Sequence, residues 1–111
     1  MKYYEDEFEL GGFTFRFKNL DPIDLLAISE QFGIYLNNFD TKIYKNYTNA
    51  ILSNTLVRVN EQWLPVKEGS NYYPATIKDN LKLIKDIVNK FIESAIVPSF
   101  QESNESTKEQ G

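Results

Sequence analysis

The sequence predicts a small α+β domain that is mainly helical, with an N-terminal β-hairpin, a second short hairpin and a disordered C-terminal tail. Three observations favour this class: strict apolar alternation around Gly11-Gly12, apolar repeats at helical spacing further along, and an end without apolar residues. A chain of 111 residues has the length of one domain. We expect residues 1–100 to form it. Residues 101–111 should be a disordered acidic tail, because they offer no apolar side chain to bury.

The first hairpin is predicted by the pattern on either side of Gly11-Gly12. A two-residue turn needs positive φ, which glycine adopts without strain. Pairing about this turn sets Phe8 opposite Phe15 and Leu10 opposite Phe13, so that one face is apolar. On the other face we expect two pairs of opposite charge, Glu7 with Arg16 and Glu5 with Lys18.

Two helices should follow. Asp21-Pro22 is a helix start, since the carboxylate can cap free N–H groups and proline fits the first helical position. Gly33 weakens the middle of this helix and indicates a close contact or a kink. The apolar repeat of this helix is Leu25, Ile28, Phe32, Tyr35 or Leu36, and Phe39. A second helix is expected from about Thr41 to Asn54.

A short hairpin is expected next, with strands at residues 56–59 and 63–66 joined by residues 60–62. Pro65 cannot donate a backbone hydrogen bond, which confines its strand to a sheet edge. The register of this hairpin is not determined by the sequence.

The strongest helical pattern runs from about Thr76 to Ile96. Its main stripe is Ile77, Leu81, Ile84, Val88, Phe91 and Ala95. Flanking residues widen the apolar arc to more than half of the circumference, which exceeds what a helix packed on one side needs. This helix is therefore either central in the fold or partly covered by another molecule.

The composition excludes several kinds of chemistry. The chain has no cysteine and no histidine, which removes thiol nucleophiles, imidazole bases and their metal sites. Its carboxylates are better explained as strand exterior, helix caps and polar helix faces than as acid–base pairs. We expect no enzyme, no cofactor and no metal. The net charge of −4 without a basic run argues against nucleic acid, and no apolar stretch suits a membrane.

Aromatic residues make up 14% of the chain, more than the predicted core positions account for. Several occupy turns or element boundaries, where tyrosine and tryptophan suit protein interfaces. The candidate protein-binding patch is Phe39, Tyr44, Trp63, Tyr72 and Tyr73.

Residues 13–26 (FTFRFKNLDPIDLL) resemble the opening of the tail assembly chaperones of long-tailed bacteriophages. The lone Trp63 after the strand at residues 57–59 is similar to their middle, and a closing helix with Ile87-Val88 and Phe91-Ile92 is similar to their end. The nearest likeness is to the tape measure protein chaperones of lactococcal siphophages. That family has no catalytic residues, so the resemblance implies none in this sequence.

The resemblance implies a non-virion late protein of the host cell cytoplasm. It would self-associate as a homo-oligomer and coat the hydrophobic, helical tape measure protein until the tail assembles. An alternative of another class is a small acidic adaptor or anti-host protein that binds one partner as a discrete monomer or dimer.

Overall fold

The computed structural model describes residues 6–96, which form an α+β domain of two β-hairpins, three α-helices and a short additional ribbon. The α+β class and both hairpins predicted from the sequence are confirmed. The tail expected at 101–111 lies outside the described residues.

The strands are β1 (Phe8–Leu10), β2 (Phe13–Phe17), β3 (Thr55–Val59), β4 (Gln62–Pro65), β5 (Lys67–Glu68) and β6 (Asn71–Tyr72). The helices are α1 (Pro22–Asn38), α2 (Thr41–Ser53) and α3 (Leu81–Phe91), with a 3₁₀ turn η2 (Ala75–Asp79) before α3 and a π turn η3 (Ile92–Ile96) after it.

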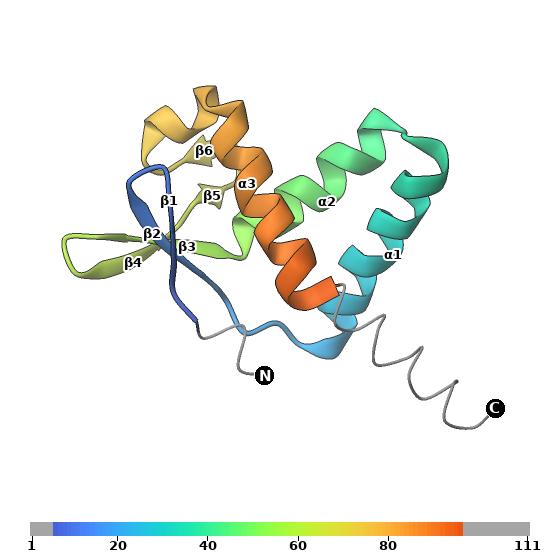
Figure 1. Cartoon of the computed structure of the whole chain (residues 1–111), viewed down its shortest axis with the longest axis horizontal. Coiled ribbons are helices and arrows are strands. Elements are labelled where there is room, and N and C mark those ends of the chain that lie inside the picture. Colours follow the sequence, from blue (N-terminus) through green and yellow to red (C-terminus); the bar gives the residue numbers. More distant parts are fainter. Residues whose placement is uncertain (1–5, 97–111) are drawn as a thin grey trace.

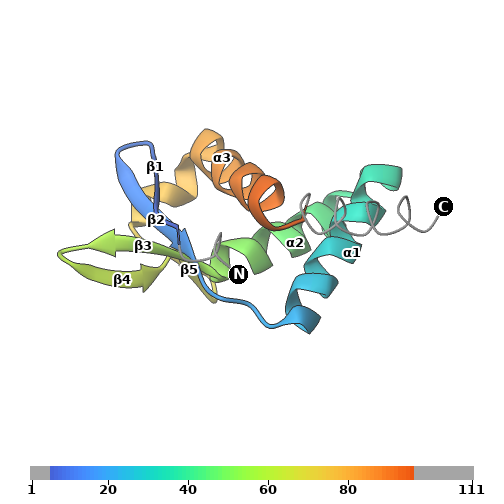
Figure 2. The ribbon, with the colours of Figure 1, turned by 60° about the horizontal axis from the view of Figure 1, so that its bottom comes forward.

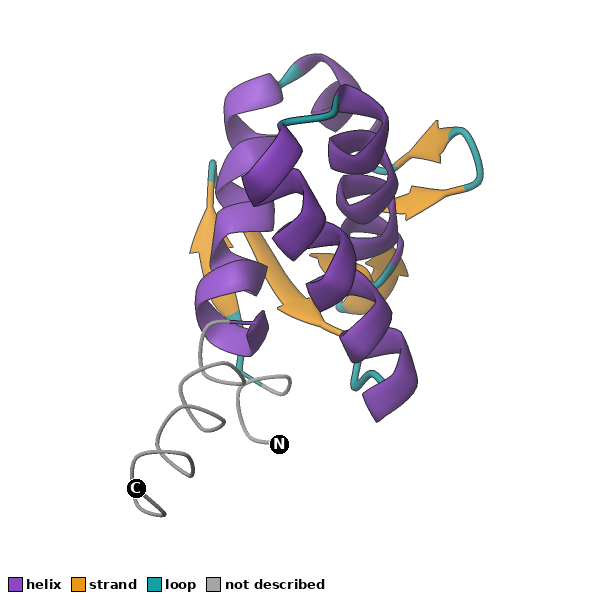
Figure 3. Cartoon of the chain, turned by 90° about the vertical axis from the view of Figure 1, so that its right-hand side faces the viewer, coloured by secondary structure: helices purple, strands orange, loops and turns teal. Residues whose placement is uncertain are grey.

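The elements lie in successive layers. The four strands β1–β4 form one antiparallel sheet in that order, and β5 and β6 form a separate two-stranded ribbon. Figure 1 shows the sheet at one side of the molecule, α1 at the other, and α2 and α3 between them. Figure 2 gives the same order from another direction, and Figure 3 shows the three helices gathered on one side of the strands. α1 is therefore the outermost helix.

The first hairpin has the predicted register, with Phe8 opposite Phe15 and Leu10 opposite Phe13. Gly11 and Gly12 both have positive φ, as a two-residue turn requires. The expected charge pairs are not what the structure shows: Glu7 lies 3.8 Å from Arg58, and the guanidinium of Arg16 lies over the ring of Trp63 at 4.6 Å. The reason is that β3 pairs with β2 and brings new partners to this face. Glu5 lies outside the described residues.

The second hairpin turns more tightly than predicted. Its turn is Asn60-Glu61 alone, both residues with positive φ, and Gln62 already pairs with Val59 in the ladder. Pro65 lies on β4, the edge strand of the sheet, as its missing N–H requires.

Two aspartates start the first two helices. The N–H groups of Ile23 and Asp24 donate to Asp21 Oδ1 at 2.9 and 3.0 Å, and that of Lys42 donates to Asp40 Oδ1 at 2.8 Å. The helix starts predicted at these positions are thus confirmed. Of the two explanations given for Gly33, a close contact or a kink, the close contact is absent, because a Cβ there would meet no atom within 4 Å.

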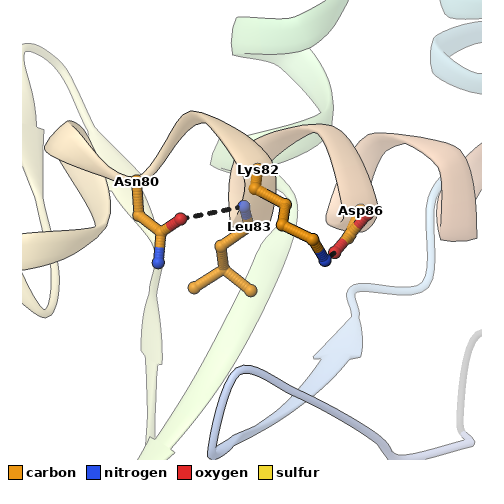
Figure 4. A network of polar contacts seen from close by, with 4 residues as sticks. All are labelled: Asn80, Lys82, Leu83 and Asp86. Carbon is orange, nitrogen blue, oxygen red and sulfur yellow. Dashed lines mark hydrogen bonds and ion pairs between the residues drawn. The ribbon is translucent and has the colours of Figure 1, made fainter.

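The long third helix predicted from Thr76 to Ile96 is interrupted. Asn80 ends η2 and caps α3, its Oδ1 accepting from the Leu83 N–H at 3.1 Å, while Lys82 and Asp86 pair one turn later at 3.1 Å (Figure 4). Because η2 winds more tightly than an α-helix, the stripe loses phase across this junction. Leu81, expected in the buried stripe, is 60% exposed instead.

The wide apolar arc of α3 is used inside the molecule. Leu83, Ile84, Ile87, Val88 and Phe91 are all buried. The ring of Phe91 meets that of Phe17 edge-on, with centroids 5.0 Å apart and planes at 89°. Of the two positions considered for this helix, the central one is therefore correct, and α3 offers no wide apolar face to another molecule.

The apolar face of the first hairpin should carry much of the stability. Phe15 is fully buried, so Phe15→Ala should lower the free energy of unfolding by about 3–5 kcal/mol. The matched control is Phe39→Ala, at a ring that is 67% exposed, which should cost less than about 1 kcal/mol. Urea denaturation measures both. Equal losses would contradict the packing of the hairpin described above.

Gly12 and Gly33 both have room for a Cβ atom but differ in backbone conformation, and this difference provides a second prediction. A Cβ at Gly33 or at Gly12 would meet nothing within 4 Å, but Gly12 has φ +84° whereas Gly33 is helical. Gly33→Ala should raise the free energy of unfolding by about 0.5–1 kcal/mol, and Gly12→Ala should lower it. Thermal melts of the two variants test this, and a destabilised Gly33→Ala would show that the helix needs glycine there.

Candidate functional site

The five aromatic residues predicted as one binding patch do not lie together. Phe39 and Tyr44 lie at the α1–α2 turn, and Trp63 lies on β4. Figure 1 places this turn and the β3–β4 hairpin at opposite ends of the molecule. Tyr72 and Tyr73 belong to β6 and the residue after it. The structure therefore does not gather these five residues on a single surface.

Phe39 and Tyr44 belong to an aromatic cluster that joins α1 to α2. Tyr35 is its centre, with ring centroids 5.6 Å from Phe39, 5.2 Å from Tyr44 and 5.6 Å from Tyr47. Phe32 adds an edge contact to Tyr47 at 5.7 Å. Such contacts stabilise beyond simple area burial. Tyr44 therefore has a packing role, and only Phe39 at the rim is strongly exposed.

The other three aromatics lie near the sheet. Trp63 is half-buried beneath Arg16, and a cation so placed over an indole is attracted to it. Tyr72 and Tyr73 line a shallow hollow of about 310 Å³ with Leu64 and Pro65. Tyr73 is exposed, so this hollow keeps part of the predicted aromatic surface.

The largest share of exposed apolar side chains lies on α1, which sequence reasoning did not single out. Seven large apolar residues are strongly exposed within residues 6–96, and five of them are on α1 or its C-cap. Ile23 is 77% exposed and Leu26 58%. These five are Ile23, Leu26, Ile34, Leu36 and Phe39.

Helical geometry separates this set into two groups. At 100° per residue, Ile23, Leu26 and Ile34 fall within an arc of about 80°. They point away from Leu25 and Ile28, which face the core. We call Ile23, Leu26 and Ile34 the outer face of α1. Leu36 and Phe39 lie toward the core side, at the C-terminal end of α1.

The outer face of α1 has an acidic setting. Residues 19–41 contain four acidic residues and no lysine or arginine. Asp21 and Asp40 cap helices, whereas Asp24 and Glu30 are exposed on α1 itself and make no ion pair with another described residue. Glu30 falls between Leu26 and Ile34 on the helix, within the outer face. The surface is thus apolar with negative charge.

Residues 6–96 contain no group of three or more histidine, cysteine, aspartate or glutamate side chains that could hold a metal ion. The hollows along their surface are open, and one of them gathers Asp6 and Glu7 beside Lys90.

Among the helices at 6–96, none combines the length and the apolar character that crossing a bilayer requires.

Comparisons with protein-family models, with curated proteins and with solved structures return no match.

The aromatic cluster also predicts a response to alkaline pH. Burial raises the pKa of the Tyr47 phenol above its usual value near 10, and the neighbouring Tyr44 and Tyr35 raise it further. Because the folded pKa exceeds the unfolded one, the stabilisation is complete below about pH 10 and is lost as pH rises beyond it. Tyr47→Phe should therefore lose less stability than the wild type between about pH 9 and pH 11. Urea midpoints across this range measure the difference, and parallel curves would contradict it.

Proposed function

We propose that this protein is a non-catalytic tail assembly chaperone that binds the hydrophobic helical tape measure protein and keeps it soluble. The observation that carries the proposal is the outer face of α1, where Ile23, Leu26 and Ile34 remain in solvent on a helix already packed on its other side. Exposed apolar side chains gathered on one helix face are characteristic of interaction sites. The partner class comes from the resemblance of residues 13–26 to tail assembly chaperones.

The energetics suit a weak contact repeated many times. Burying one isoleucine or leucine side chain fully is worth about 1.5–3 kcal/mol. Three partly exposed side chains thus supply a few kcal/mol, an affinity of about millimolar order for one copy. Many copies on one long client raise the effective concentration and make the coat stable, while any single copy can leave when the tail forms. A chaperone that must be displaced requires this combination.

The proposal includes self-association in the host cytoplasm, outside the mature virion. Because the apolar arc of α3 is internal, the surface for contact between copies must lie elsewhere. The hollow lined by Tyr72 and Tyr73 is a candidate, since Tyr73 is exposed and an edge strand lies beside it. Head-to-tail contacts that do not close would give an open spiral suited to an extended client.

Co-expression with a candidate tape measure protein tests the client. We expect the wild type to move the tape measure protein into the soluble fraction and to co-purify with it. A triple variant, Ile23→Gln/Leu26→Gln/Ile34→Gln, should lose this effect while keeping its helical circular dichroism. If the tape measure protein is equally soluble with the wild type, with the triple variant and alone, the chaperone proposal is contradicted.

Light scattering tests the oligomer. We expect species larger than a dimer that persist at high salt, because screening weakens exposed charge contacts and not apolar burial. The double variant Tyr72→Ser/Tyr73→Ser should shift the distribution toward monomer. A strict monomer at tens of micromolar would contradict self-association and favour the adaptor, whereas oligomers that dissociate in salt would assign the contacts to charges.

A further inference from the structure

We propose that the outer face of α1 binds an amphipathic helix whose apolar stripe is flanked by lysine or arginine. The inference rests on the proposed function, because it names the part of a helical client that this site accepts. It follows from the length of the face, the position of its charge and the lack of lysine and arginine in residues 19–41.

The face has the length of a helix-docking site. Ile23 and Ile34 are eleven residues apart, which at 1.5 Å per residue is about 16 Å, or three helical turns. Leu26 lies between them on the same side. A helix that docks here therefore needs anchors at i, i+3 or i+4, i+7 and i+11, the usual spacing of helix recognition.

Glu30 sets the charge of the partner. It is exposed, lies within the outer face, and makes no ion pair with another residue of the described part of the chain. A partner that covers Leu26 and Ile34 must also cover part of Glu30, and an unpaired carboxylate is costly to remove from water. A lysine or arginine beside the partner's apolar stripe would pair with it, and another could reach Asp24 on the flank.

The same charge argues against a second copy of this chain in an antiparallel two-fold contact. In such a contact the face meets itself, and residues near its middle meet their own equivalents. The middle of the face lies between residues 28 and 29, so the two Glu30 carboxylates would lie within about one helical turn of each other. Two like charges would then enter an apolar contact without a cation.

The test uses three synthetic helical peptides of about 18 residues, each long enough to cover the face. One carries a leucine stripe flanked by lysine, its twin carries glutamate in place of lysine, and the third has the composition of the first in scrambled order. We expect the lysine peptide to bind the full chain about tenfold more tightly than the glutamate peptide at low salt, as two or three exposed ion pairs would give. The scrambled peptide should bind weakly.

Matched variants locate the site. Leu26→Gln should weaken the lysine peptide about tenfold, whereas Leu81→Gln, at an equally exposed leucine of α3, should leave binding within about twofold. Glu30→Lys should remove or invert the preference for the lysine peptide, and Glu68→Lys on β5 should not. If Leu26→Gln melts early, Ile23→Gln replaces it, because that side chain is still more exposed.

Four results would overturn the inference: no binding of the lysine peptide, equal binding of both stripe peptides, equal binding of the scrambled peptide, or equal losses in Leu26→Gln and Leu81→Gln. A dimer that Leu26→Gln abolishes, without peptide binding, would assign the face to a second copy instead. The two proposals fail separately. Client solubilisation without peptide binding would move the client to another surface, and peptide binding without client solubilisation would leave the site with a different basic partner.

Discussion

The structure depends on burying α3 on two sides at once. Its residue Phe91 meets Phe17 of the sheet edge-on, and Leu83 lies where a Cβ at Gly11 would approach its Cδ1 to 3.2 Å. From its other side α3 packs toward α2, and Ile87 is fully buried between these neighbours. The five buried side chains of α3 span an arc of about 140°, which the sheet and α2 cover together, while its lysines stay in solvent. The hairpin turn, the sheet register and the placement of α2 together bring apolar side chains into contact with α3.

With α3 and α2 covering the sheet, α1 packs mainly against α2, with a smaller contact to η3. It is held there by the burial of Leu25 and Ile28 and by a ring cluster around Tyr35, rather than by burial on two sides. Its outer face therefore stays in solvent although three of its residues are aliphatic. The exposure of Ile23 and Leu26 is a consequence of layer order, and this makes α1 the natural place for a partner.

The local features of the fold could be predicted because short-range rules decide them. Gly11-Gly12 fixed the first register through its turn, and Asp21-Pro22 fixed the start of α1 through its cap. The pairing of β2 with β3 could not be predicted, since about forty residues separate them and no local signal sets their register. The break at Asn80 was missed although the signal was present: an asparagine that can cap, followed by a hydrophobic run, inside an otherwise continuous pattern.

Aromatic content and helical position point to different surfaces of this molecule. The rings of Phe32, Tyr35 and Tyr44 lie half-buried between α1 and α2, because they hold an outer helix that has a single packed side. Little of their surface is left for a partner. The side chains that remain free to contact a partner are then the aliphatic residues of the outer face of α1. Their spacing was readable: Ile23, Leu26 and Ile34 fall opposite Leu25 and Ile28 on one helical wheel. A helix apolar on both sides, in a chain too small to bury both, is a stronger sign of a partner than the count of its aromatic residues.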